Sequence, residues 1–302
     1  MELLSLGFLA QVIRISVPYL LAALGGTFCE RGGVTNIALE GLLLGGAFAA
    51  AAGSLLLGDT LGPVGGVLIG ILAGVALAAL YGLVVLRLRA DQIVSGVAIT
   101  LLASGLTRFL LKALYDSSSN SPRLHGLDPP AWAAGGGLAG FLGETLASPL
   151  VLASAATIVA SHLVLGRTRF GLRLRAAGEH PEALRSVGVD PLSLRWAGVL
   201  ISGALAGLGG VFLAYDQHKF VGNMSAGRGY IALAAMILGG WTPLGATSAC
   251  VLFGFIEALQ LRLQSSAVGG GLVQVLPHVV TVLVLAARAR RRSAPRALGR
   301  PL

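Results

Sequence analysis

Long uninterrupted apolar stretches constrain this chain more than any other feature of its sequence. They approach the length that a helix needs to cross lipid, about 20 residues, and they recur along most of the 302 residues. Charged residues make up only 12% of the chain, whereas a soluble domain carries about 25%. A transmembrane β-barrel would alternate apolar and polar side chains, and these stretches do not. The sequence therefore predicts an all-α bundle that crosses a membrane several times.

The apolar stretches divide the chain into candidate membrane spans within one transmembrane domain, residues 1–302. About 8–9 spans of this length are expected, with re-entrant or broken helices among them. The stretch 229–243 is short for a full crossing, so we expect a half-helix there or a helix packed inside the bundle. The candidate spans are residues 6–28, 35–57, 62–86, 92–114, 149–166, 196–216, 229–243, 245–263 and 272–288.

Basic residues gather in two regions that flank apolar spans. Of the 22 Lys and Arg residues, six lie in 167–195 and six lie in 288–300. The positive-inside rule predicts that the loop 167–195 and the basic tail 289–302 are cytoplasmic, and both would also contact anionic membrane lipid. This placement explains the net charge of +9 without nucleic acid, which is not expected as a partner. The loop 115–148 has a single Arg and is predicted to be external.

The two basic regions also limit how the chain can cross the membrane. If 167–195 and the tail share one side, an even number of crossings must separate them. The side of the N-terminus stays open, because it is external if both 6–28 and 35–57 cross and internal if one of them re-enters.

Residues 30–41 form the densest polar group in an apolar setting. Two glycines interrupt the helix, and Asn36 and Glu40 follow at a spacing that would place them on one helix face. An ionisable group inside a membrane is costly and marks a functional position by default. The segment is interpreted as a broken-helix junction along a path for a polar solute. The alternative is that Glu40 bonds backbone or Arg31 and only fixes helix packing.

A second polar face begins at residue 92. Gln92, Ser95 and Thr100 extend the candidate solute path along one helix. The alternative is that these hydroxyl groups bond the carbonyls of their own helix, as Ser and Thr often do in membrane spans.

A ridge of small residues is expected in the span 62–86. A four-residue spacing keeps side chains on one helix face, and such a ridge lets another helix approach closely. The ridge is interpreted as a seam in the core or in a dimer, and the alternative is general glycine-rich packing. Its members are Gly62, Gly66, Gly70 and Gly74.

No motif in the sequence indicates catalysis or metal binding. Gly-x-Ser-x-Gly, His-Glu-x-x-His and Cys-x-x-Cys patterns do not occur, and there is no phosphate-binding loop ending in Gly-Lys-Ser/Thr. Cys29 and Cys250 lie in or beside apolar spans and are interpreted as small apolar core residues. We therefore predict no catalytic residue, no metal ligand and no cofactor bound by this chain.

Several motifs occur in an order that matches a known family. They are Glu30–Gly41 (ERGGVTNIALEG), Gln92–Gly96 (QIVSG), the loop 171–188 and Gly227–Ala234 (GRGYIALA), with Leu259–Gln264 (LQLRLQ) near the end. Through them the chain resembles the membrane permease subunits of bacterial ABC importers of the branched-chain amino acid and ribose type. Within that group it is most similar to the purine-nucleoside permeases.

The resemblance implies a set of partners. ATP and Mg would be bound by a separate ABC ATPase subunit, and a second permease subunit, a paralogue or a second copy, would complete the pore. An external solute-binding protein or lipoprotein would deliver the cargo. The expected location is the bacterial cytoplasmic (inner) membrane.

The resemblance also implies that a cytoplasmic coupling helix docks on the ATPase. Pro181 suits a first helical turn and Gly188 a helix end. The alternative is a basic loop that touches only lipid head groups. The matching positions are Gly171, Arg173, Arg175, Ala176, Gly178, Glu179, Pro181, Ala183 and Gly188.

Two other functions stay open at this point. The same kind of importer could carry a pentose or a branched-chain amino acid, because sugar permeases share parts of these motifs. A stand-alone secondary transporter is the alternative from another class. An inverted internal repeat would favour a secondary transporter, and no such repeat is evident in the sequence.

Overall fold

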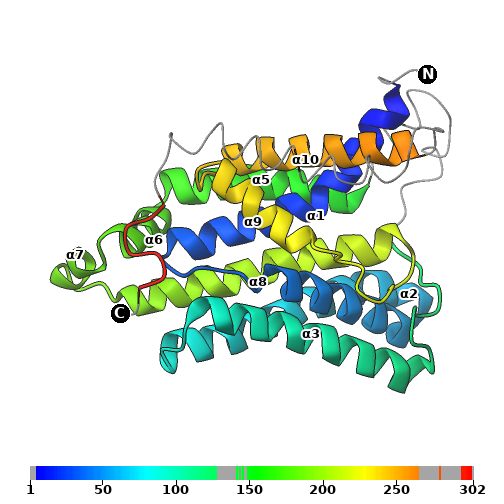
Figure 1. Cartoon of the computed structure of the whole chain (residues 1–302), viewed down its shortest axis with the longest axis horizontal. Helices are drawn as coiled ribbons and strands as arrows, with labels where there is room; N and C mark the ends of the chain where they lie inside the picture. The colour runs from blue at the N-terminus through cyan, green and yellow to red at the C-terminus, as the bar shows by residue number, and fades with distance from the viewer. Residues whose placement is uncertain are drawn as a thin grey trace.

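The computed structural model describes residues 5–127, 141, 143, 145, 148–264, 279 and 294–300. In these residues helices lie side by side in one bundle (Figure 1). Six helical segments are long and apolar enough to cross a membrane. The all-α transmembrane bundle predicted from the sequence is therefore confirmed. The predicted span 272–288 and much of the predicted external loop and basic tail lie outside the described residues.

The helices follow the predicted spans closely, with one addition between α5 and α8, where two short helices occupy the basic loop. A short π-helical turn, η1, extends α2. The bounds are α1 Leu6–Arg31, α2 Leu39–Gly82, η1 Leu83–Arg87, α3 Gln92–Tyr115, α5 Pro149–Arg167, α6 Arg169–Glu179, α7 Pro181–Ser186, α8 Pro191–Asp216, α9 Arg228–Leu238 and α10 Pro243–Gln264.

The element α2 consists of two helices that fold back on each other. The chain reverses at Gly58, whose φ of 72° and ψ of −177° belong to a region that essentially only glycine occupies. Beyond the turn the helices run antiparallel, because a Cβ on Gly62 would lie 2.4 Å from the Ser54 carbonyl oxygen and one on Gly66 would lie 2.7 Å from that of Ala50. The two predicted spans are thus present. The first begins at Leu39 and not at residue 35, because the preceding residues are not helical.

The glycine ridge of α2 packs inside the chain. A Cβ on Gly74 would lie 2.3 Å from the carbonyl oxygen of Gly203 in α8, and one on Gly70 would lie 2.5 Å from Val211 and 2.9 Å from the Gly46 carbonyl oxygen. Backbones approach this closely only where side chains are absent. The ridge therefore joins the second half of α2 to α8 and to the first half of α2.

The helix α9 is a half-helix, as its short sequence predicts. It has 11 residues, and its N-terminal end lies inside the bundle, where a Cβ on Gly229 would be 2.3 Å from the backbone nitrogen of Glu40. The chain enters this position from the end of the bundle where α8 stops, and α10 leads back toward the same end (Figure 1). The α9–α10 junction lies next to Arg31, the last residue of α1, so the chain reaches the far end of the bundle through α9 and returns through α10, which is long enough to cross a membrane.

The two ends of the bundle differ in their contents. Figure 1 shows α6, α7 and the C-terminus at one end and the N-terminus at the other. Residues 294–300 contact α6, since the Ala297 N–H donates to the Gly178 carbonyl at 2.8 Å. Ser5 accepts from Arg262 at the opposite end. The basic loop and the C-terminal segment therefore share a side, which the positive-inside rule favours as cytoplasmic, and the N-terminus lies on the other side.

We expect Gly74→Ala to destabilise the protein by about 1–3 kcal/mol, the usual effect of overpacking. The added methyl group would overlap a carbonyl oxygen of α8, at a position where neither backbone can withdraw easily. The thermal denaturation midpoint of detergent-purified protein measures the change. Gly105→Ala on α3 is the matched control, because a Cβ there has no neighbour within 4 Å. An equal effect of both substitutions would contradict close packing at the ridge.

Candidate functional site

The helices α1 and α2 are separated by a buried non-helical segment, residues 32–38. Gly33 has a φ of 93°, which favours glycine. Around this break the side chains of Glu30 and Asn36 are only 2% and 0% exposed. The expected broken-helix junction is therefore present. Asn36 and Glu40 do not share a helix face, because the helix starts only at Leu39.

Glu40 caps the N-terminus of α9. Its two carboxylate oxygens accept from the backbone N–H groups of Gly227 at 2.8 Å and Gly229 at 2.7 Å. A helix N-terminus leaves N–H groups without partners inside the helix and carries partial positive charge, so a carboxylate is well matched to it. Gly227 has a φ of 86°, and Gly229 packs against the Glu40 backbone. This explains the Gly-Arg-Gly sequence at that position.

Asn36 lies between Glu30 and α8. Its side-chain amide donates to Ser202 at 2.7 Å, and its backbone N–H donates to Glu30 at 3.4 Å. Asn36 Oδ1 has no hydrogen-bond partner. Within the described residues, two other buried side-chain atoms also lack one, Arg195 Nε and Ser225 Oγ. The break therefore contains one unfilled acceptor in an otherwise bonded polar cluster.

Gln92, Ser95 and Thr100 lie on α3 beside the break. Gln92 accepts from the Thr35 N–H at 2.7 Å, so it supplies a partner to the non-helical backbone. The Ser95 hydroxyl donates to the Asp91 carbonyl at 2.6 Å and the Thr100 hydroxyl donates to its own helix at 3.1 Å. These bonds stabilise the break and α3, and in this conformation the five predicted solute-path residues face other parts of the protein.

Two residues that the sequence did not single out complete this region. The Tyr81 hydroxyl donates to the Thr35 carbonyl, and the Trp241 indole donates to Glu30 at 2.6 Å. Both satisfy polar groups where the helix is interrupted. A lone Tyr or Trp in an apolar stretch gives little sequence signal, because core packing is its usual role.

The basic loop folds into two short helices, α6 and α7, where the sequence suggested one coupling helix. Thr168 caps α6 by accepting from the Gly171 N–H at 3.0 Å. The helix stops at Glu179 because the next residue, His180, precedes a proline and takes non-helical angles of φ −143° and ψ 75°. Pro181 then opens α7, as expected, and Gly188 beyond it has a φ of 74°.

The predicted coupling residues divide between an inner and an outer side of this pair of helices. Gly171 and Gly178 are buried against α5 and α1, where a Cβ would lie 2.1 Å from the Val164 oxygen and 2.3 Å from the Arg31 oxygen. Arg175 bonds back to the Gly171 carbonyl at 3.3 Å. The remaining members are exposed or partly exposed: Arg173, Ala176, Glu179, Pro181, Ala183 and Gly188.

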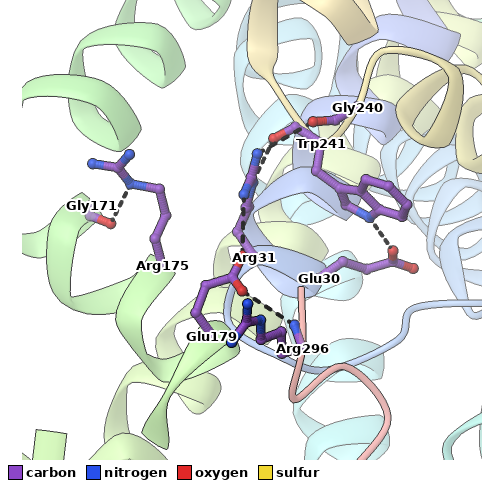
Figure 2. A network of polar contacts seen from close by, with 8 residues as sticks. All are labelled: Glu30, Arg31, Gly171, Arg175, Glu179, Gly240, Trp241 and Arg296. Carbon is purple, nitrogen blue, oxygen red and sulfur yellow. Dashed lines mark hydrogen bonds and ion pairs between the residues drawn. The ribbon is translucent and has the colours of Figure 1, made fainter. Parts of the chain in front are cut away.

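Arg31 connects α6 to the junction between α9 and α10. Figure 2 shows its guanidinium between the two, donating to the carbonyls of Trp241 at 2.7 Å and Gly240 at 3.3 Å. On its other side it forms an ion pair of 3.9 Å with Glu179, the last residue of α6. The end of α1 is therefore linked by side chains to two parts of the chain that are distant in sequence.

Arg195 is a further site residue that sequence reasoning did not select. It lies in the first turns of α8, is 1% exposed, and donates to the Arg300 carbonyl at 2.7 Å. The available signal was a single Arg inside an apolar helix, one residue before Trp196. It was interpreted only as part of the basic loop.

Comparison with known proteins places these features in a family. Residues 8–286 match the family model described as the branched-chain amino acid transport system permease component. The chain is 36% identical to the guanosine ABC transporter permease protein NupQ of Bacillus subtilis, over 95% of this chain and 93% of that one. It is also 36% identical to the nucleoside ABC transporter permease protein NupC of Lactococcus lactis, over 96% and 94%.

A solved structure shares the fold. It is a metal-chelate type ABC transporter in an inward-facing conformation, with a TM-score of 0.53 and 14% sequence identity. The similarity covers 92% of this chain and 85% of the other. At this identity the match concerns the arrangement of helices alone.

We expect Glu40→Ala to lower the stability of the folded protein by about 2–4 kcal/mol, because it leaves two N–H groups at the start of α9, one of them buried, without an acceptor. The thermal denaturation midpoint in detergent measures the loss. Asp59→Ala removes a carboxylate that is 89% exposed and should leave the midpoint unchanged. An unchanged denaturation midpoint for Glu40→Ala would contradict the capping role.

Proposed function

Because this chain belongs to the family of branched-chain amino acid transport system permease components, we propose that it is the membrane subunit of an ABC importer for nucleosides. Purine nucleosides are the proposed cargo. The single observation that carries this proposal is 36% identity to a guanosine permease and to a nucleoside permease over nearly the full length of each chain.

The proposed importer has further subunits. A separate ABC ATPase binds ATP and Mg and hydrolyses ATP, while this chain contributes no catalytic residue and no cofactor. A second permease, a paralogue or a second copy, completes the pore. An external solute-binding protein delivers the nucleoside, and the assembly lies in the bacterial cytoplasmic membrane.

The proposed coupling site is the exposed side of α6 and α7. The geometry supports it, because the buried side of α6 touches the end of α1 at Gly178 and the pair of short helices lies at the basic end of the bundle. A movement of α7 would be transmitted through Glu179 to Arg31, and from Arg31 to the α9–α10 junction. The nucleotide state of the ATPase would in this way reach the membrane interior.

The solute path stays a proposal built on the break. Asn36 and Glu40 are polar groups within the bundle, and Asn36 Oδ1 is an unfilled acceptor that suits a ribose hydroxyl. Gln92, Ser95 and Thr100 line the same region of α3. Their groups are now bonded within the protein, so contact with solute requires the break to open during transport.

We expect cells or vesicles that contain the complete importer to take up labelled guanosine, with unlabelled nucleosides competing and ribose or leucine failing to compete. If leucine or ribose alone competes, the nucleoside proposal is wrong and the cargo is an amino acid or a pentose, respectively. Flux driven by a proton gradient in vesicles without the ATPase would favour a secondary transporter instead.

We expect Ala183→Trp to reduce guanosine uptake to background, because Ala183 is exposed on α7 and a large side chain there would obstruct the ATPase. Uptake and membrane abundance are measured together. Ala113→Trp, at an exposed position of α3 away from α6 and α7, is the control and should retain uptake. If the Ala183→Trp variant keeps full uptake, α7 is not part of the proposed contact with the ATPase.

A further inference from the structure

Residues 294–300 form a C-terminal strap across the bundle end that holds α6. The Ala297 N–H donates to the Gly178 carbonyl at 2.8 Å, and the Gly299 N–H donates to the Gly33 carbonyl at 3.2 Å. One short segment thus bonds to the end of α6 and to the break between α1 and α2. Figure 2 shows a third bond, from the Arg296 N–H to Glu179 at 3.3 Å.

Arg195 holds the strap from the side of α8. Its guanidinium donates to the Arg300 carbonyl at 2.7 Å and to the Ala297 carbonyl at 3.5 Å. A Cβ on Gly33 would lie 3.0 Å from Arg195 Nη2, so the same guanidinium also packs against the break. A buried charge is costly unless polar partners surround it, and the carbonyls of the strap are such partners.

The strap also borders a groove beside α7. The groove has a volume of about 590 Å³ and is lined by α7 residues including Ala183, by Arg195 and by Arg296 and Arg300 of the strap. The strap and α7, part of the surface proposed to meet the ATPase, therefore border the same groove.

We propose that the C-terminal strap, held by Arg195, is a positioning element that makes α6 and the α1–α2 break move together. This inference rests on the proposed function, since it assigns a role within ATP-driven transport. Without the strap, α6 and the break would be joined by the close approach at Gly178 and by the partly exposed ion pair between Glu179 and Arg31. With it, backbone bonds connect both segments to one short stretch of chain, and Arg195 bonds that stretch to α8.

The test uses the complete importer in proteoliposomes, with guanosine uptake and ATP hydrolysis measured on the same sample. Arg195→Gln removes the bonds to both carbonyls, and Ala297→Pro removes the N–H that reaches α6. We expect either change to lower the ratio of guanosine transported to ATP hydrolysed by about five-fold or more, the lower range of coupling effects between sites. Arg195→Lys keeps a charged donor and should recover part of the ratio.

The controls separate this role from a general loss of structure. Arg87→Gln removes an exposed charge at the same end of the molecule, and Ala294→Ser changes an exposed residue of the strap. Both should keep the wild-type ratio. If the Arg195→Gln variant does not assemble, the ratio measured for the Ala297→Pro variant tests the proposal.

The proposal is overturned if the assembled variants keep the wild-type ratio, whether uptake and hydrolysis both stay at the wild-type level or both fall in proportion. Either result would leave the strap as a purely structural element. Wild-type importer that hydrolyses ATP without moving guanosine would instead count against the proposed function.

Discussion

The bond between Glu40 and the start of α9 is the interaction on which the arrangement of the bundle depends. Backbone N–H groups inside a membrane must find partners within the protein, because no water is available to them. Here a helix begins inside the bundle, and a carboxylate from another broken segment accepts from its first N–H groups. A buried carboxylate and a helix start inside the bundle, each unfavourable alone, therefore satisfy each other.

Close backbone packing makes this arrangement possible. Gly229 brings α9 against Glu40, and glycines of α2 and α8 bring those helices against each other without intervening side chains. The polar break is then enclosed by apolar helices, with Asn36 fully buried. Small residues thus determine how near the helices lie, and polar residues determine where the helices are interrupted.

Local patterns in the sequence were sufficient for much of this fold. Apolar stretches predicted the transmembrane helices, the double glycine predicted the break, and Pro181 predicted the start of α7. What they could not predict was pairing across the chain. The acceptor for α9 is 187 residues before Gly227, and no local spacing connects them.

The candidate site shows the same division. The sequence selected Asn36 and Glu40 because polar residues are rare in apolar spans, and the structure brings both to the break. It placed them on one face because it assumed a continuous helix from residue 35. Arg195 was overlooked because its partners are backbone carbonyls of residues 297 and 300, and a carbonyl has no signature in the sequence.

The position of Arg31 has a consequence for how the bundle can rearrange. Its guanidinium reaches two carbonyls on one side and a carboxylate at 3.9 Å on the other. A small rotation of α6 would shift the guanidinium from one set of partners toward the other, so the cation would keep a polar partner throughout. The link between α6 and the α9–α10 junction therefore does not require a fixed geometry.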